Sequence, residues 1–377
     1  MVARYEGLDG APEILSDGGP EEPAAPEPPR GKIVAVAVAA FVLAASGGYY
    51  LGSRGAPADK EEAAADGVVV IPVPGGNPSG AGLAAGSVWV TTWDGSVLRM
   101  DPESREVEAT VAVGEGPLAA GEGFGSVWVT SSADGTVTRI DPEDNSVLGT
   151  IEVGPVPFQI AAAGGGMWVA TQDAAVKIDP GENRVVLRVP YPKEPTAQTP
   201  STAGVGLDAD ERGVWVSTAH GTVLRLRPDN GRLVETIRVL PDAHTSPGSV
   251  AIDGNHVWVS NWAVESAAGP GAGVPRLGAT VGIVDIDATT NEIIHRVRSA
   301  GYPVSGMLPR DGSVYMVGGY DENHTSVLIR ADFPYEVLTS MVPVGGSSFD
   351  VVAVNGSLWV PSFEEKAVYV LPDEVAD

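Results

Sequence analysis

The residues best suited to chemistry in this sequence are aromatic residues, carboxylates and histidines at the predicted tips of loops. No Ser-His-Asp elbow, phosphate-binding loop or HExxH helix joins them. Exposed aromatic rings beside carboxylates suit the binding of a polar ligand, a sugar or a peptide. We therefore predict a ligand-binding face that includes Trp93, Asp94, Gln159, His220, Trp262, Glu265, Tyr320, Asp321, Glu322, His324, Asp350 and Phe363.

Two of the five histidines, His220 and His324, fall at such tips. Together with Glu265, a histidine pair could hold a divalent metal or abstract a proton, although no cofactor is predicted. His256 directly precedes a core strand and His295 lies in an outer strand, so structural roles are predicted for both.

Composition and charge exclude several classes of function. The chain has 377 residues and no cysteine, so disulfides, zinc-thiolate sites and thiol nucleophiles are excluded. Its formal net charge of -26 opposes binding to phosphate backbones, and no nucleic-acid partner is expected. The abundance of Ala, Gly, Asp and Val is typical of a high-GC bacterial genome.

A repeated phrase predicts the elements that position the candidate residues. "GSVWVTTWDGSVLRMDP" from Gly86 is followed by "GSVWVTSSADGTVTRIDP" from Gly125. The aromatic core of this phrase recurs seven times, with spacings of 39, 40, 47, 43, 57 and 44 residues. Such a period, with four β-rich runs in each unit, predicts a seven-bladed β-propeller. The seven aromatic residues are Trp89, Trp128, Trp168, Trp215, Trp258, Tyr315 and Trp359.

The second unit shows the predicted strands of one blade. They cover residues 117–123, 126–131, 136–141 and 146–153, from the inner to the outer strand. Alternation in "VWV" places Trp on one face of the sheet, so these aromatics are predicted to pack between blades. The recurring Asp-Pro pairs at Asp101, Asp141 and Asp179 are interpreted as turns and not as metal ligands.

The two ends of the repeat region complement each other. The last unit stops after "AVYVLPD" (367–373) and lacks an outer strand, whereas the region opens with the unpaired strand "GVVVIPV" (67–73). The opening strand is therefore expected to complete the seventh blade and to leave no open end in the ring.

At these motifs the chain resembles the YVTN/YncE-like seven-bladed β-propellers and, more loosely, the streptogramin lyase propellers. The resemblance covers about residues 67–377 and rests on the V-W-V strand, the "G-x-V-x-R-[IL]-D-P" strand and turn, and the "[IV]-x-V-G" exit. It implies the propeller fold and a broad group of binding proteins, surface proteins and a few enzymes. The catalytic motif of the lyases is not matched, so that activity is not carried over.

Three segments precede the propeller. Residues 1–31 are Pro-rich, contain seven acids and two Arg, and are predicted to be a disordered tail. Residues 32–54 are predicted to form a transmembrane helix, because 21 uncharged residues separate Lys32 from Arg54. A cleaved signal peptide fits less well, because Lys32 is preceded by a 31-residue segment in which acids outnumber basic residues. Residues 55–66 read as a linker. The expected arrangement is a single-pass membrane protein with a cytoplasmic N-terminus and the propeller outside.

Four expanded connections, residues 190–203, 240–248, 261–279 and 318–325, are predicted to lie on one face of the propeller. The leading hypothesis is a membrane-tethered, non-catalytic module that binds a ligand or protein partner in the cell envelope through this face. The alternatives are a metal-dependent lyase or lactone hydrolase on the same face, and a structural spacer of the cell envelope.

Overall fold

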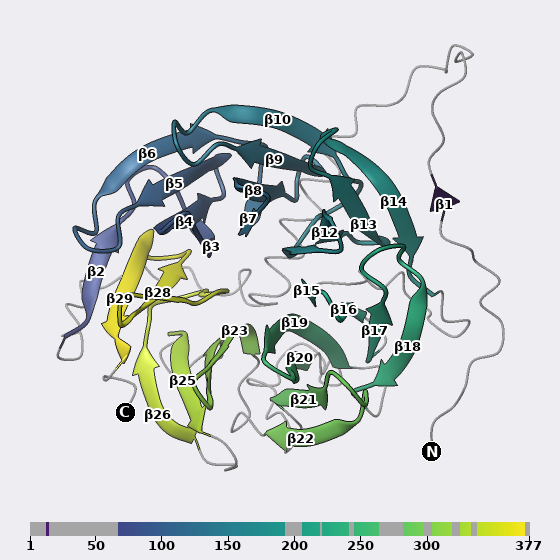
Figure 1. Ribbon diagram of the computed structural model, residues 1–377. Helices are drawn as coiled ribbons and strands as arrows, with labels where there is room; N and C mark the ends of the chain where they lie inside the picture. The colour runs from purple at the N-terminus through teal and green to yellow at the C-terminus, as the bar shows by residue number, and fades with distance from the viewer. Residues whose placement is uncertain are drawn as a thin grey trace, which may run out of the picture.

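The chain forms a ring of seven antiparallel β-sheets around one axis, as the computed structural model shows (Figure 1). The structure describes residues 13–14, 67–192, 206–218, 221–240, 245–263, 282–297, 304–318, 325–332 and 338–373. Six sheets have four strands and one has five. The prediction of an all-β, seven-bladed propeller is confirmed.

In the first six blades the strands run from the axis outward in chain order. The first blade contains β3 (Pro78–Ala84), β4 (Ser87–Thr92), β5 (Ser96–Met100) and β6 (Val107–Ala112). The second contains β7 (Pro117–Gly123), β8 (Ser126–Ser131), β9 (Thr136–Ile140) and β10 (Val147–Glu152). The third contains β11 (Ile160–Ala163), β12 (Gly166–Ala170), β13 (Ala174–Asp179) and β14 (Arg184–Pro190). The fourth contains β15 (Leu207–Asp210), β16 (Gly213–Thr218), β17 (Thr222–Leu226) and β18 (Leu233–Arg238). The fifth contains β19 (Thr245–Asp253), β20 (His256–Ala263), β21 (Ile283–Asp287) and β22 (Ile293–Val297). The sixth contains β23 (Val304–Arg310), β24 (Ser313–Gly318), β25 (Val327–Asp332) and β26 (Leu338–Pro343).

The seventh blade joins both ends of the propeller. It contains β27 (Val352–Val354), β28 (Ser357–Ser362), β29 (Ala367–Pro372) and, as its outermost strand, β2 (Val69–Pro72). β2 pairs antiparallel with β29 from Val69↔Val370 to Pro72↔Ala367. The first blade is thereby held against the last by backbone hydrogen bonds, which closes the ring (Figure 1).

A further strand lies within the segment predicted to be a disordered tail. β1 (Glu13–Ile14) pairs antiparallel with the outer strand β14, with Glu13 opposite Arg188 and Ile14 opposite Leu187. It gives the third blade its fifth strand, on the outer side of the ring (Figure 1).

The repeated aromatic residues pack between blades, as predicted. Trp89 and Trp128 are fully buried, and Arg99 and Arg139 lie over their rings at 5.8 and 4.9 Å. Each arginine also reaches the following blade, because Arg99 Nη1 donates a hydrogen bond to Pro142 O at 2.6 Å and Arg139 Nη1 donates one to Pro180 O. Each cation therefore covers its own tryptophan and fastens the next blade.

The two faces of the ring carry different connections. Val113, just after the outer strand β6, donates a hydrogen bond from its N to Gly95 O in the β4–β5 hairpin at 2.8 Å. The connections from an outer strand to the next blade therefore lie on the same side as the hairpins between second and third strands. This side is called the top face, and it is the side predicted to carry the four expanded connections. The bottom face carries the turns between first and second strands and between third and outer strands. In the turn between β5 and β6, Asp101 Oδ1 accepts hydrogen bonds from Glu103 N and Ser104 N at 2.9 and 2.6 Å. These contacts confirm the turn interpretation of the Asp-Pro pairs.

The predicted transmembrane helix at 32–54 lies outside the described residues, as does the linker at 55–66. Within the part of the chain that the structure describes, no helix is long and apolar enough to cross a membrane.

Candidate functional site at the seam between the first and seventh blades

Two predicted site residues from opposite ends of the propeller meet on the top face. Trp93 lies at the tip of the β4–β5 hairpin and Phe363 at the tip of the β28–β29 hairpin. Their ring centroids are 6.3 Å apart and the rings are edge to face. Both side chains are partly exposed, whereas the repeated tryptophans of the blades are buried. Both residues are among the predicted site residues, but the sequence does not indicate that they lie together.

Asn77 holds this aromatic pair in place. Its carbonyl oxygen accepts a hydrogen bond from Trp93 N at 2.9 Å, and its Nδ2 donates one to Phe363 O at 2.8 Å. Asn77 precedes β3, so one residue at the start of the first blade contacts both hairpin tips, that of Trp93 through its backbone carbonyl and that of Phe363 through its side chain. Asn77 is not among the predicted site residues, because nothing in its local sequence indicates a contact with a residue so far along the chain.

Carboxylates adjoin both aromatic residues along the chain, because Asp94 follows Trp93, and Glu364 and Glu365 follow Phe363. Asp94 Oδ1 accepts hydrogen bonds from Thr92 Oγ1 at 2.6 Å and Ser96 Oγ at 3.1 Å, so Asp94 also stabilises its own hairpin. On the other hairpin, Glu364 Oε1 accepts from Ser347 Oγ at 2.8 Å and Glu365 Oε2 from Gly346 N at 2.6 Å. All three acids belong to exposed residues. The seam therefore offers aromatic surface within an acidic rim, which suits a ligand that carries positive charge.

Asp350, another predicted site residue, lies deeper at the same seam. Its Oδ2 accepts a hydrogen bond from Ala81 N in β3 at 3.2 Å, and its Oδ1 accepts one from Val351 N at 2.9 Å. Burial raises the pKa of Asp350 to about 6, although both backbone hydrogen bonds oppose the shift. The carboxylate thus satisfies a backbone amide on the inner edge of the neighbouring blade.

Gln159 has a similar position on the other side of the axis. Its Oε1 accepts hydrogen bonds from Leu207 N at 2.9 Å and Val250 N at 3.2 Å, which belong to the fourth and fifth blades. Gln159 and Asp350 therefore lie beside the innermost strands and connect blades, whereas Trp93, Asp94 and Phe363 lie at hairpin tips. The structure brings Trp93 and Phe363 together and does not place Gln159 with them.

Asp208, which sequence reasoning did not select, connects the fourth and fifth blades. Its Oδ2 accepts a hydrogen bond from Ile252 N at 2.8 Å. Burial raises its pKa to about 6, and the nearby Asp210 adds to the shift. The only sequence signal is a pair of carboxylates, Asp208 and Asp210, in an inner strand whose other two residues are Leu207 and Ala209.

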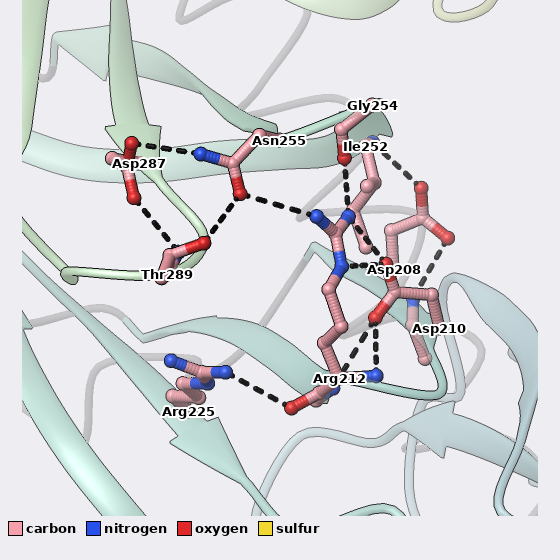
Figure 2. Close-up of polar contacts among 11 residues, drawn as sticks. Asp208, Asp210, Arg212, Arg225, Ile252, Gly254, Asn255, Asp287 and Thr289 are labelled. Carbon is pink, nitrogen blue, oxygen red and sulfur yellow. Dashed lines mark hydrogen bonds and ion pairs between the residues drawn. The ribbon is translucent and has the colours of Figure 1, made fainter.

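A polar network below Asp208 fastens these two blades on the bottom face (Figure 2). Arg212 Nε donates to Asp210 Oδ2 at 2.7 Å, and the same guanidinium contacts Gly254 O and Asn255 Oδ1. Asn255 Nδ2 donates in turn to Asp287 Oδ2 at 2.7 Å. Each member of this network has its partners within the protein, which indicates a structural role.

The fifth blade departs from the repeated cation described above. Five blades have Arg or Lys opposite the buried aromatic, and the seventh has Val370 opposite Trp359. The fifth blade has Asp285 opposite Trp258, and Asp285 is fully buried. His256 Nδ1 and His295 Nδ1 lie 2.9 and 3.0 Å from Asp285 Oδ2. His256 also stacks on Trp258, with ring centroids 5.8 Å apart. These contacts agree with the structural roles predicted for both histidines. An alignment of the repeats would show that Asp285 stands where most other blades have a cation.

Several predicted site residues cannot be placed. Trp262 lies in β20, and only its backbone is described, paired with Ser246. Others lie outside the described residues, namely His220, Glu265, Tyr320, Asp321, Glu322 and His324. Among the residues that are described, no group of three histidines or carboxylates could hold a metal ion.

Comparison with known proteins supports the fold. No protein-family model and no curated protein matches the sequence. The structure is similar to that titled hydrazine synthase of Kuenenia stuttgartiensis, with a TM-score of 0.61 and 15% identity over 84% of this chain and 99% of that chain. It is also similar to the Pan2 WD40 domain of Neurospora crassa, with a TM-score of 0.59 and 11% identity over 78% of this chain and 88% of that chain. A computationally designed protein, Ika8, gives a TM-score of 0.54 at 11% identity, over 81% of this chain and 99% of that chain. At such identities the likeness shows the propeller fold alone, and the resemblance to YncE-like propellers stays a prediction.

Proposed function

We propose that this protein is a binding module that holds a cationic ligand, such as a basic peptide segment of a partner protein, at the seam between the first and seventh blades. The observation that carries the proposal is the contact between Trp93 and Phe363, two partly exposed aromatic residues at hairpin tips. Packing between blades requires buried aromatics, but it does not require an aromatic pair at this position.

Charge supports the choice of ligand. Asp94, Glu364 and Glu365 border the aromatic pair, with Lys366 as the basic residue of the same hairpin, and the whole chain has a formal net charge of -26. A cation over an aromatic ring contributes about 0.5–1 kcal/mol at an exposed site. The acidic rim would also speed the encounter with a basic partner, and salt would reduce this effect.

Peptides test this proposal directly. The full chain is presented with immobilised peptides of equal length that are rich in Lys and Arg, neutral, or rich in Glu. We expect the basic peptides alone to be retained, with retention falling as salt rises. The Trp93→Ala/Phe363→Ala variant should lose this binding.

Phe124 provides the matched control, because it is 44% exposed and lies in the β7–β8 turn on the bottom face. Phe124→Ala should bind as the wild type does. Equal binding by the Trp93→Ala/Phe363→Ala variant would contradict the proposed site, and failure of every peptide class would favour the structural spacer. The lyase or lactone hydrolase alternative and the attachment to the cell envelope stay predictions.

A further inference from the structure

Among the residues that the structure describes, a fifth strand lies beside the outer edge of the third blade and beside no other outer edge. β14 has seven residues, whereas the other outer strands have four to six. The outer strand of a sheet leaves backbone N–H and C=O groups unpaired, and these groups can accept an additional strand. β1 occupies this edge, with Glu13 opposite Arg188 and Ile14 opposite Leu187 (Figure 1).

Charge distinguishes β14 as well. It contains Arg184 and Arg188 and no acid, whereas β6, β10 and β18 each contain a glutamate. β14 is the only outer strand with two arginines among those described. The segment before residue 32 contains seven acids and two arginines. Both arginines also have acidic partners on the propeller, since Arg184 Nε lies 2.5 Å from Glu182 Oε2 and Arg188 Nη2 lies 2.5 Å from Asp173 Oδ1. The preference of this edge for an acidic segment is therefore small, on the order of the 0.2–1 kcal/mol of an exposed ion pair.

The chain is long enough for this pairing to occur within one molecule. Residues 15–66 connect β1 to β2, and they could span up to about 170 Å if fully extended. A domain of this size has a radius of gyration of about 20 Å. The connection therefore reaches from the seventh blade to the third without strain.

We propose that the outer edge of the third blade is a strand-addition site, and that the acidic N-terminal segment around Glu13–Ile14 is its intramolecular ligand. Bound in this way, the segment covers an edge that would otherwise be open to a strand from another molecule. The backbone pairing supplies affinity, and the arginines of β14 favour an acidic segment over a basic one. This proposal is independent of the proposed site on the top face.

Amide hydrogen exchange of the full chain tests the proposal, with β14 compared to β10, an outer strand beside which the described part of the chain places no further strand. We expect slower exchange for β14 than for β10. Glu13→Pro/Ile14→Pro removes both backbone N–H groups of β1 and should speed exchange of β14 several-fold. Leu8→Pro/Asp9→Pro, the same change outside β1, should leave it unaltered. Equal exchange of β14 in the wild type and in the Glu13→Pro/Ile14→Pro variant would overturn the proposal.

Two further arms examine charge and molecularity. Glu13→Lys places a cation opposite Arg188 and should speed exchange of β14, whereas Glu6→Lys, with the same change of charge, should have a smaller effect. Protection that is unchanged on dilution supports pairing within one chain. Protection that disappears on dilution would overturn the intramolecular assignment and would indicate pairing between two copies.

Discussion

Asp350 in the seventh blade accepts a hydrogen bond from the backbone amide of Ala81 in the first blade, with 3.2 Å between Oδ2 and N. A titratable group thus connects the innermost strands where the ring closes. Asp208 makes the equivalent contact with Ile252 between the fourth and fifth blades. Stability of the propeller should therefore depend on the ionisation of these two acids.

The sign of this dependence follows from the pKa shift. The folded pKa of Asp350 is raised from 3.8 to about 6, so the folded state binds more protons than the unfolded state between these values. The free energy of unfolding should then decrease as pH rises from about 4 to about 6 and stay lower above that. Asp350→Asn removes this titration and should reduce the decrease by about half, because Asp208 continues to contribute. Denaturant unfolding across this pH range measures the slope; an unchanged slope in the variant would show that Asp350 does not cause it.

Close packing of inner strands gives a second prediction. A Cβ added at Gly82 in β3 would lie 2.0 Å from Ala120 O in β7. Gly82→Ala should therefore separate the first two blades and reduce the free energy of unfolding by about 3 kcal/mol. Gly181→Ala is the control, because its nearest contact would be Asp179 Oδ1 at 3.2 Å. Similar denaturation midpoints for the two variants would contradict this account of blade spacing.

The buried carboxylate of Asp285 in the fifth blade gives a third prediction. Asp285→Ala leaves the Nδ1 atoms of His256 and His295 without their common partner and opens a space beside Trp258. We expect a loss of about 2 kcal/mol in the free energy of unfolding, measured with denaturant. Glu143→Ala, at an exposed position, should change it by less than about 0.5 kcal/mol. A loss for Asp285→Ala no larger than this control would mean that the cluster is not stabilising.

Membrane topology gives a fourth prediction that also bears on β1. The predicted crossing at 32–54 places the N-terminus and the propeller on opposite sides of a membrane, whereas pairing of β1 with β14 in one chain requires the same side. Because the chain has no cysteine, Ser16→Cys and Glu103→Cys each introduce a unique thiol. The strand-addition proposal predicts that an impermeant maleimide labels both variants or neither on intact cells. Labelling of Glu103→Cys alone would support the predicted crossing and reject the intramolecular pairing.

The sequence determined the architecture because each repeat carries its own local signals. Neighbouring residues alone produce the V-W-V alternation and the Asp-Pro turns after Ile140 and Met100. The unmatched strand at 67–73 follows from the number of strands in each repeat. The types of residue at the hairpin tips could be predicted for the same reason, and Trp93 and Phe363 were both selected.

Only the tertiary structure decided which of these residues meet. Trp93 and Phe363 come together because closure of the ring joins the first and last blades of the propeller, and no local pattern encodes a contact over that separation. For the same reason, the contacts of Asp350 with Ala81 and of Gln159 with Leu207 and Val250 could not be predicted. They depend on how blades are placed about the axis, which is a property of the closed ring and not of any single repeat.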